Sequence, residues 1–473
     1  MGPLRVSPWW TRGLSNAMIS RRQLLLSAAV KRRPPNVLFL CSDQHLTSAA
    51  GCYGSREVRT PNIDAIAATA TRFNHAYCQA PVCVPSRGSI ITSQYPHKHG
   101  ARILQDALPD DARTVAHFFK ERGYATAAIG KMHFVDETRR HGFDHRLHEG
   151  SFLETLTAEE RTQFKRDQGG AEGVEGRPSP LADRFFQDYW FADESVKFLH
   201  ANRDRPFCLW TSFFMPHTPL VPQERFFKSY DPAKLTLPKR SEHELEAGFQ
   251  GHLIRARERG WYGQTDAQLR QSLQGYYGNV SQMDACVGRV FNALRELGLD
   301  RNTVVVYTSD HGEMAGAHRM WTKHNMYEQS VNVPLMISAP RDVRANALAN
   351  QMVEQVDLFP TLADLCGFAP PRELAGRSFA PLLRGKRFQA REFAYSEYYF
   401  CRNVFTRDDR FVGKPPIVMV RTDRWKFNFL SWERCELFDM QTDPGEFENV
   451  VDAVGNAGIV RELRAQAERV FGG

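Results

Sequence analysis

The sequence predicts an α/β protein with a large, doubly wound, mostly parallel sheet flanked by helices, followed by a small C-terminal antiparallel α+β domain. Continuous apolar runs, typical of strands buried on both faces, alternate with helical patterns as far as about residue 370. Short polar motifs directly follow several of these runs, and open α/β sheets bind ligands at this end of their strands. Beyond residue 370 the runs become short and alternating, as in an antiparallel sheet.

The first part of the chain contains the elements of the large sheet. Buried strands are predicted over residues 36–41, 124–129, 207–214 and 303–307. Helices are predicted from the spacing of apolar residues over 61–71, 114–122, 188–200 and 276–297. Gly123 and Gly298 suit the ends of the second and fourth of these helices. Residues 151–185, with an exposed loop over 169–176, and residues 220–270 show no clear pattern, so we expect mainly loops there.

The last hundred residues are expected to form a separate small domain. Its strands are predicted over residues 393–398, 417–422, 425–430 and 437–440, and a final helix carries Ile459, Leu463 and Val470 on one face. The domain boundaries that follow are 1–33, 34–370 and 371–473. The first of these segments is interpreted as a basic tail or a degenerate leader.

The positive charge of the chain is confined to its first segment. Residues 1–33 contain seven Lys and Arg residues and no acid, which accounts for the whole net charge of +7. The rest of the chain is neutral overall, so we expect no nucleic-acid partner. No apolar run approaches the roughly 20 residues of a membrane span, so we expect none.

The nine cysteines form no Cys-x-x-Cys pair and no zinc-binding spacing. An odd number spread over a large domain indicates reduced thiols, which favours a cytoplasmic location. Export is the alternative, because residues 20–26 resemble the start of a twin-arginine signal. The apolar stretch that follows is short, and the basic residues 31–33 interrupt it.

A possible anion site begins at Cys83, in the run Cys-Val-Pro-Ser-Arg over residues 83–87. Pro85 presets the backbone for a first helical turn, where free N–H groups and the positive end of the helix dipole lie. A group derived from Cys83, the Arg87 guanidinium and this helix N-terminus would together suit a tetrahedral oxyanion. The alternative is a buried cysteine ahead of an ordinary helix.

Two aspartates follow buried strands. Asp43 and Asp310 each end an apolar run, and each is followed by a second possible ligand, Gln44 and His311. A carboxylate in this position is costly unless it is paired or bound to a cation. The two pairs indicate one divalent metal with mainly oxygen ligands: Ca²⁺ first, with Mg²⁺ or Mn²⁺ as alternatives. Alternatively, each aspartate only caps the next turn.

Four other polar residues would, taken singly, be ordinary surface residues, and only the resemblance described below assigns them to the same site. Lys131 and His133 follow the predicted strand 124–129, His217 lies between two prolines, and Lys323 opens a Lys-His-Asn-Met-Tyr-Glu run. The remaining histidines that we considered are expected to be ordinary surface residues: His45, His97, His99, His117, His318 and His324.

Residues 83–87 resemble the signature of the sulfatase family, Cys-x-Pro-Ser-Arg, whose cysteine is oxidised after translation to formylglycine. The resemblance extends from about residue 35 to about residue 450, and the run at Lys323 matches the Lys-x-x-x-Tyr-Glu motif of the family. Asp43-Gln44, Asp310-His311 and the run Gly-Lys-Met-His-Phe-Val over 130–135 look most like choline sulfatases and phosphonate monoester hydrolases. The chain departs from the family at residues 91–94, which read Ile-Thr-Ser-Gln where many members have Leu-Thr-Gly-Arg.

The resemblance implies an alkaline phosphatase-like fold whose catalytic domain spans residues 34–370. It implies hydrolysis of a sulfate ester to an alcohol and inorganic sulfate, with a sulfated small molecule or carbohydrate as the substrate. A formylglycine-generating enzyme would be a partner in maturation. The implied metal ligands are Asp43, Gln44, Cys83 as formylglycine, Asp310 and His311.

The resemblance also implies a role for each catalytic residue. Cys83, as hydrated formylglycine, supplies the nucleophilic hydroxyl and Arg87 orients it. Lys131, His217 and Lys323 hold the sulfate oxygens, and His217 or Lys323 protonates the leaving alcohol. His133 takes the proton of the second hydroxyl, so that sulfate is expelled and the aldehyde returns.

Two other functions remain open from the sequence. The same residues would serve a phosphonate or phosphate ester hydrolase, which Gln44 and His311 favour. If Cys83 stays a thiol, the domain would instead bind a sulfated ligand without hydrolysing it.

Overall fold

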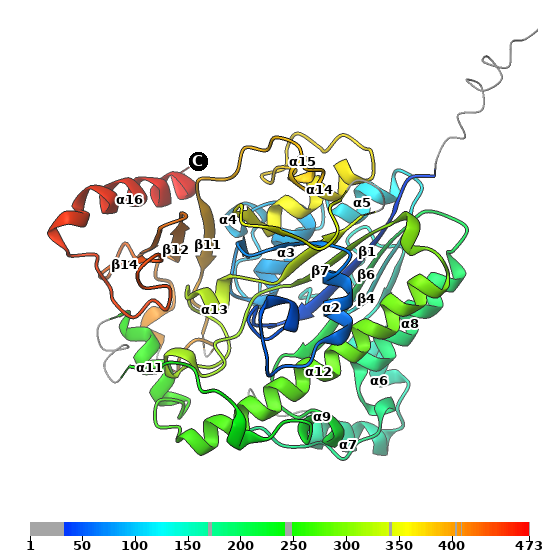
Figure 1. Cartoon of the computed structure of the whole chain (residues 1–473), viewed down its shortest axis with the longest axis horizontal. Coiled ribbons are helices and arrows are strands. Elements are labelled where there is room, and N and C mark those ends of the chain that lie inside the picture. Colours follow the sequence, from blue (N-terminus) through cyan, green and yellow to red (C-terminus); the bar gives the residue numbers. More distant parts are fainter. Residues whose placement is uncertain are drawn as a thin grey trace, which may run out of the picture. The chain divides into compact units, whose positions relative to one another are not determined.

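A mixed sheet lies at the centre of the described part of the chain (Figure 1). The structure is a computed structural model that describes residues 33–168, 173–241, 248–339, 343–402, 404–407 and 409–472. Within these ranges eight strands form the sheet, in the order β5-β4-β6-β1-β7-β8-β2-β9. Their bounds are Asn36–Asp43 (β1), Thr71–Phe73 (β2), Ala125–Gly130 (β4), His145–Leu147 (β5), Phe207–Pro216 (β6), Thr303–Ser309 (β7), Leu335–Ser338 (β8) and Ala347–Ala349 (β9). A short parallel pair lies apart: Ala76–Tyr77 (β3) and Val353–Glu354 (β10).

The middle of this sheet is parallel, as predicted. Strands β5, β4, β6, β1 and β7 pair in parallel, while β8 runs antiparallel to β7 and to β2. The predicted buried strands correspond to β1, β4, β6 and β7. Strand β1 extends to Asp43 and β7 to Ser309, so the polar motifs begin inside or directly after the paired strands.

Helices cover both faces of the sheet, which confirms the doubly wound architecture. Along β1, Val37 and Phe39 belong to one apolar core, and Leu38 and Leu40 to the other. The core of Leu38 is completed by α2 (Pro61–Ala67), α8 (Gln187–Ala201) and α12 (Asp266–Glu296). The core of Val37 is completed by α3 (Cys83–Thr92), α5 (Val115–Lys120) and α14 (Leu358–Leu365).

The structure corrects the prediction for residues 151–185, about half of which are helical, and places two helices within residues 220–270, whose other described residues are mainly irregular as expected. These helices are α6 (Glu149–Glu154), α7 (Ala158–Gln168), α9 (Glu224–Phe227) and α11 (Gln250–Glu258). Helices α6 and α7 each bury a single residue, Phe152 and Phe164, so their sequences carry little hydrophobic periodicity. Of the loop predicted over residues 169–176, residues 169–172 lie outside the described ranges.

The long helix α12 starts ten residues before its predicted beginning, and ends where predicted. The Thr265 hydroxyl accepts a hydrogen bond from the backbone N–H of Gln268, and the Gln268 side chain accepts one from Thr265 N–H. This Thr-x-x-Gln capping box is a local signal for a helix start. Gly298, at φ 67°, follows the last turn.

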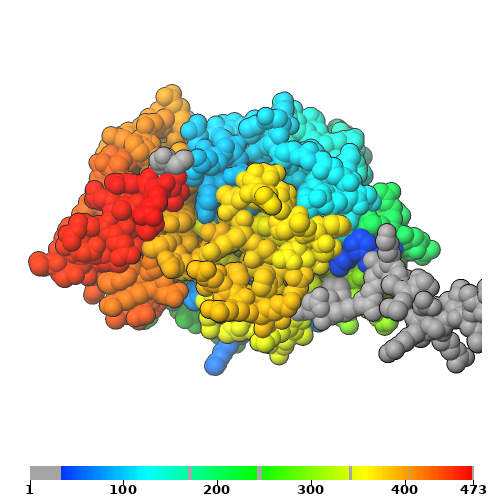
Figure 2. All heavy atoms as spheres, turned by 90° about the horizontal axis from the view of Figure 1, so that it is seen from above, coloured from blue at the N-terminus to red at the C-terminus, as the bar shows by residue number. Residues whose placement is uncertain are grey.

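The C-terminal region forms the predicted antiparallel sheet with one long helix. Its strands are Ala394–Tyr398 (β11), Ile417–Arg421 (β12), Trp425–Phe429 (β13) and Glu436–Asp439 (β14), and its helix is Ala457–Gly472 (α16). Three short helices complete the description: Pro96–His99 (α4), Glu328–Val331 (α13) and Ala380–Leu383 (α15). Figure 2 shows the segment of α14 and α15, in yellow, between the C-terminal residues and the cyan residues that include α5.

Three expectations from the sequence concern the N-terminal segment, the domain boundary and a membrane span. The segment interpreted as a tail or leader, residues 1–33, lies outside the described residues except for its last residue. The boundary at residue 370 stays a prediction. No helix in the described ranges has the length and apolar character needed to cross a membrane.

A buried ion cluster ties the C-terminal sheet to the large domain. Lys426 on β13 is fully buried, donates to Glu328 of α13 at 3.1 Å and forms an ion pair with Glu446, whose Oε1 lies 2.7 Å from its Nζ. Burial alone would raise the pKa of Glu328, but Lys426 and Arg421 lower it to about 2. The two carboxylates therefore depend on the lysine ammonium for compensation.

Replacing this lysine should destabilise the protein strongly. We expect Lys426→Met to lower the free energy of unfolding by about 3–5 kcal/mol, because it leaves the fully buried Glu446 without its cation and Glu328 with Arg421 alone. Denaturant unfolding measures the change. Arg424→Ala is the control, since Arg424 is half exposed and solvent screens its ion pair with Asp439, so we expect a much smaller loss. Equal losses in the two variants would contradict this account.

Candidate active site

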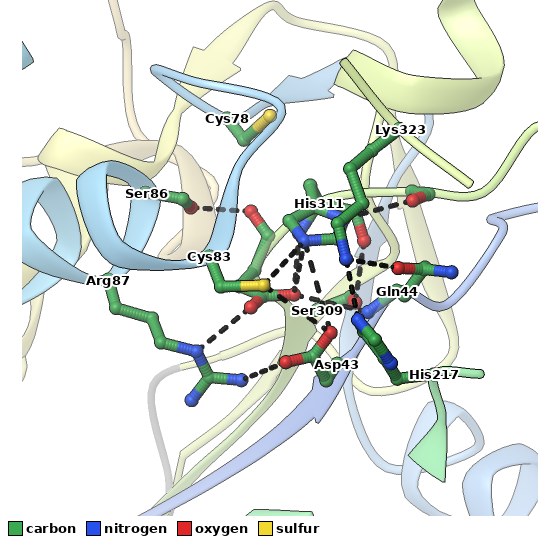
Figure 3. Close-up of polar contacts among 12 residues, drawn as sticks. Asp43, Gln44, Cys78, Cys83, Ser86, Arg87, His217, Ser309, His311 and Lys323 are labelled. Atoms are coloured by element: carbon green, nitrogen blue, oxygen red, sulfur yellow. Dashed lines mark hydrogen bonds and ion pairs between the residues drawn. The ribbon is translucent and has the colours of Figure 1, made fainter. Parts of the chain in front are cut away.

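The neighbouring parallel strands β1 and β7 bring the two predicted aspartates together. Ser42 lies opposite Ser309 in the strand register, so Asp43 and Asp310 emerge side by side at the carboxyl ends. Arg87 reaches both from α3: Nε lies 2.8 Å from Asp310 Oδ2, and Nη2 lies 3.3 Å from Asp43 Oδ2 (Figure 3). The side chains of all three residues are fully buried.

Cys83 points into this acidic corner from the first turn of α3. Its Sγ lies 3.2 Å from His311 Nε2 and 3.8 Å from Asp43 Oδ1 (Figure 3). The other nitrogen of His311, Nδ1, donates to the carbonyl oxygen of Gly312 at 3.0 Å. Because a carbonyl oxygen only accepts, Nδ1 carries a proton, and Nε2 is the nitrogen that faces Cys83 and the carboxylates.

Four of the predicted ligands fit a divalent metal. Asp43, Cys83, Asp310 and His311 each offer one ligand atom, and these atoms lie within 4.8 Å of one another in a buried cluster. Two carboxylates and one oriented imidazole are suitable donors for a hard or borderline cation. The bond to Gly312 engages Nδ1 of His311 and leaves Nε2 as the nitrogen that would bind a metal, which supports this fit.

The side chain of Gln44, the fifth predicted ligand, makes other contacts. Its Oε1 accepts a hydrogen bond from Lys323 Nζ at 2.5 Å, and its Nε2 donates to the buried carboxylate of Glu313. Gln44 therefore joins Glu313 to Lys323 in this structure. Its role as a metal ligand stays a prediction.

Cationic residues surround the other side of Cys83. Lys131 Nζ lies 2.5 Å from Asp43 Oδ2, and Lys323 Nζ lies 2.6 Å from His217 Nε2. His217 Nδ1 donates to Thr218 O at 2.7 Å, so its Nε2 carries the lone pair that accepts from Lys323. The predicted site residues Lys131, His217 and Lys323 thus converge on one place from three separate segments.

The charges of this cluster shift its ionisation. Burial and Asp43 alone would raise the pKa of the Cys83 thiol, but Lys323, Lys131 and His311 together lower it well below its usual value. Burial would likewise raise the pKa of Asp43, which Lys131 above all lowers well below its usual range. The site is therefore built to hold anionic groups in a buried environment.

His133 is the predicted site residue with the least contact to the others. It is half buried, at φ 55°, and its Nδ1 is buried without a hydrogen-bond partner. None of the hydrogen bonds found among the described residues joins its ring to Cys83 or Lys131. Its role as a base stays a prediction.

The histidines expected at the surface need correction. His45, His99, His318 and His324 are buried, while His97 and His117 are half buried. His45, for example, is 2.8 Å from the Tyr307 hydroxyl and 3.1 Å from Ala49 O, under the loop that follows β1. Sequence position gave no sign of this burial, because each of these histidines lies in a loop or at a helix end.

Several residues that support the site were not identified from the sequence. Ser212 on β6 lies 2.7 Å from Arg87 Nη1, and Arg87 also donates to the backbone oxygen of Lys131. Arg255 on α11, fully buried, donates to Lys323 O at 2.5 Å and Thr322 Oγ1 at 2.7 Å. Of these residues, only Glu313 could have been found from the sequence, because it stands three residues after Asp310 in the same polar motif.

Comparison with protein families agrees with this fold and site. The sulfatase family model matches residues 35–368, and the model of the C-terminal region of N-sulphoglucosamine sulphohydrolase matches residues 316–471. The chain therefore belongs to the sulfatase family. It is a sulfuric ester hydrolase with the alkaline phosphatase-like fold, in a family that typically uses a metal and a formylglycine.

Individual relatives are similar over most of their length. A choline-sulfatase of Rhizobium meliloti is 28% identical over 442 residues, 88% of this chain and 82% of the relative. An arylsulfatase of Clostridium perfringens is 27% identical over 457 residues, 89% of this chain and 90% of the relative. The crystal structure of a phosphonate monoester hydrolase of Agrobacterium radiobacter superposes with a TM-score of 0.82 and 23% identity, covering 93% of this chain and 95% of that one. This last likeness shows the shared fold.

The position of Lys131 depends on Gly130, which ends β4. Gly130 has φ 103°, and a Cβ there would lie 1.8 Å from the backbone oxygen of Ser212. We expect Gly130→Ala to lower the free energy of unfolding by at least about 3 kcal/mol, or to shift Lys131 away from Asp43 with loss of activity. Unfolding curves and turnover measure both effects.

Gly123→Ala is the matched control for this change. Gly123 also has a positive φ, of 80°, but nothing lies within 4 Å of its added Cβ. Its substitution should cost only about 1–2 kcal/mol of backbone strain and leave activity intact. If Gly130→Ala behaved like Gly123→Ala, the close contact with Ser212 would not be what positions this turn.

Proposed function

We propose that this protein hydrolyses a sulfate ester. The reaction would use a formylglycine formed from Cys83 together with a bound divalent metal, for which Ca²⁺ is the first candidate. The single observation that carries the proposal is the convergence around Cys83. Its Sγ faces His311 and Asp43 on one side, and two cations approach on the other: Lys131 from the end of β4 and Lys323 from the loop before α13. A tetrahedral anion requires positive groups of this kind around a nucleophile.

The metal would be held by Asp43, Asp310, His311 and the modified side chain of Cys83, with Gln44 as a further candidate. When bound, it would polarise a sulfate oxygen and favour ionisation of the nucleophilic hydroxyl. Arg87 keeps both carboxylates in place, because its guanidinium bonds to Asp43 and Asp310 at once. Arg87 also lies one turn after residue 83 on α3, where it can orient the hydroxyls of a hydrated aldehyde.

Lys323 is the residue that we propose as the general acid. Its ammonium group donates to His217 Nε2 and to Gln44 Oε1, while the proton of His217 is engaged at Nδ1 by Thr218 O. Lys323 can therefore give a proton to the leaving oxygen, with His217 holding the lysine in position. Lys131 would bind sulfate oxygens, and His133 remains the proposed base for sulfate release.

The first test of this proposal is the mass of one tryptic peptide. Cleavage after Arg72 and Arg87 isolates residues 73–87 from protein made in its native host. Conversion of the thiol to the aldehyde lowers the mass by about 18 Da. Cys78→Ala is the control, since Cys78 lies in the same peptide and should leave the conversion of Cys83 unchanged.

Loss of Cys83 should abolish hydrolysis. We expect Cys83→Ala to lower sulfate ester turnover by at least about four orders of magnitude, because it removes the nucleophile. Turnover of an aryl sulfate by the variant and by Cys78→Ala measures the effect. An unmodified thiol in active wild-type protein, or an active Cys83→Ala, would contradict the proposed mechanism.

Metal removal should have a comparable effect. Dialysis against a chelator is expected to lower turnover by about a hundredfold or more, because two carboxylates and Cys83 would lose their shared cation. Adding Ca²⁺, Mg²⁺ or Mn²⁺ singly to the dialysed protein, with elemental analysis, identifies the metal. Full activity in protein shown to contain no metal would exclude this part of the proposal.

A phosphonate or phosphate ester hydrolase is the second candidate function. The pairs Asp43-Gln44 and Asp310-His311 favour it, with His311 in contact with Cys83 and Gln44 in contact with Lys323. Comparing kcat/KM for an aryl sulfate and an aryl phosphonate ester with the same phenol separates the two functions. The sulfatase proposal expects the sulfate to be the better substrate.

A further inference from the structure

Glu313 is a buried carboxylate to which the proposed mechanism gives no role. It lies in the loop that follows β7 and is fully buried. One of its oxygens, Oε1, accepts hydrogen bonds from the backbone N–H groups of Ala315 at 2.9 Å and Thr322 at 2.5 Å. The other oxygen, Oε2, accepts one from the side-chain amide of Gln44. Three donors therefore converge on this carboxylate.

The bond to Thr322 holds the backbone that leads into Lys323. Met314 N–H also donates to Thr322 O, at 2.9 Å, so Glu313 and Met314 together close the neck of the loop between residues 313 and 322. Thr322 and His324, on either side of Lys323, have φ values of 66° and 78°. A left-handed conformation is unfavourable for a β-branched residue such as Thr322, so bonds from its surroundings must maintain it. Glu313 supplies one of these bonds.

The bond to Gln44 determines which end of the Gln44 amide faces Lys323. The Lys323 ammonium can only donate hydrogen bonds, and a carboxylate can only accept them. The Gln44 oxygen therefore faces Lys323, 2.5 Å from its Nζ (Figure 3), and the Gln44 nitrogen faces Glu313. The second acceptor for the ammonium is His217 Nε2, at 2.6 Å. These two acceptors leave one of the three N–H groups of Lys323 for a ligand.

We propose that Glu313 is a positioning residue for Lys323, which it holds through the backbone of Thr322 and through the orientation of the Gln44 amide. This inference rests on the proposed function, because Lys323 is the general acid of the proposed reaction. A general acid must lie within hydrogen-bond reach of the leaving oxygen, so a small displacement of its ammonium lowers the rate of the step that it assists. Glu313 acts through its two partners rather than on the substrate.

The change Glu313→Gln tests the orientation of the amide. The new side chain has almost the same shape, and its oxygen can still accept from the N–H groups of Ala315 and Thr322, so the fold should be kept. Its amide nitrogen then faces Gln44. Gln44 would need to accept from this nitrogen and from the Lys323 ammonium at once, but its amide has only one oxygen. One of the two contacts is therefore lost.

Two aryl sulfates with different leaving groups measure the consequence. 4-Nitrophenol is a much stronger acid than phenol, so 4-nitrophenyl sulfate needs little protonation of its leaving oxygen, whereas phenyl sulfate depends on it. We expect Glu313→Gln to lower kcat/KM about a hundredfold for phenyl sulfate and less than about fivefold for 4-nitrophenyl sulfate. Loss by the same factor for both esters would indicate a merely structural role and overturn the proposal, as would two unchanged rates.

Exchanging the two groups should restore the contacts. In the double variant Gln44→Glu, Glu313→Gln, the carboxylate at position 44 accepts from both the amide nitrogen at position 313 and Lys323, and the net charge is unchanged. Gln44→Glu alone places two carboxylates against each other and should also lower the rate. We expect the double variant to exceed Glu313→Gln at least about tenfold in kcat/KM for phenyl sulfate. No recovery would overturn the proposal.

Metal content is measured in each variant, because Gln44 is also a candidate metal ligand. We expect Glu313→Gln to bind as much metal as the wild-type protein while its rate on phenyl sulfate falls. Loss of bound metal in proportion to the lost rate would assign the Gln44 oxygen to the metal rather than to Lys323. That result would overturn the proposal.

Glu397→Gln is the matched control. Glu397 is also fully buried, and its carboxylate bonds to His97 and to the Tyr399 hydroxyl, neither of which belongs to the proposed site. The change replaces a buried carboxylate by an amide in the same way, and it should leave the ratio of the two aryl sulfate rates at its wild-type value. If Glu397→Gln altered this ratio as much as Glu313→Gln, the effect would not come from Lys323 and the proposal would fail.

Crystal structures separate failure of this inference from failure of the proposed function. If protein with formylglycine at position 83 and a bound metal hydrolyses no sulfate ester, the proposed function is wrong. The role of Glu313 is then judged from contacts in Cys83→Ala protein. Adding Glu313→Gln should lengthen the contact of Gln44 with Lys323 or with residue 313 beyond about 3.5 Å, and adding Gln44→Glu as well should restore both. Two contacts unchanged by Glu313→Gln would overturn the inference.

Discussion

The arrangement of the site depends on the buried guanidinium of Arg87 between two carboxylates. Asp43 and Asp310 emerge from adjacent parallel strands, where their mutual repulsion in a buried place would be severe. Arg87 bonds to both, and its Nη1 also bonds to Ser212 on β6 and to the backbone oxygen of Lys131. One side chain thus connects β1, β6, β7 and the end of β4, so that a change at any of these strands is transmitted to Cys83.

The charge balance of this cluster explains why a cation is expected next to Cys83. Lys131 is also bonded to Asp43, and His311 faces Cys83 Sγ through Nε2. A tetrahedral anion bound near Lys131 would compete with Asp43 for the lysine ammonium. A divalent cation shared by the carboxylates would release Lys131 for that anion, which links metal binding to substrate binding.

The segments between the strands support the residues of the site. Helix α11 carries Arg255, which holds the backbone of Lys323, and the Glu313–Gln44 bond steadies the amide that accepts from the same lysine. The first turn of α8 carries Gln187 and Asp188 against the end of β6. The two aspartates and Lys131 therefore lie at strand ends, whereas Cys83 lies on α3 and Lys323 in a loop that α11 supports.

The sequence by itself determined the apolar strands β1, β4, β6 and β7, the long helix α12, and the order in which polar motifs follow the strands. These features depend on local periodicity and on the preference of a buried strand for apolar residues. It also placed Asp43, Cys83 and Asp310 at points where a ligand would lie. Helices α6 and α7 were missed because each buries only one side chain and so lacks a periodic signal.

Only the tertiary structure decided which polar groups meet. The order β6-β1-β7 brings Ser212, Asp43 and Asp310 together, although these residues are more than 90 positions apart in the chain. The burial of His45 and His324, the contact of Arg255 with Lys323 and the unpaired amide of Gln187 likewise arise from packing between distant segments. Periodicity reports which face of an element is buried, but it contains no information on which element covers that face.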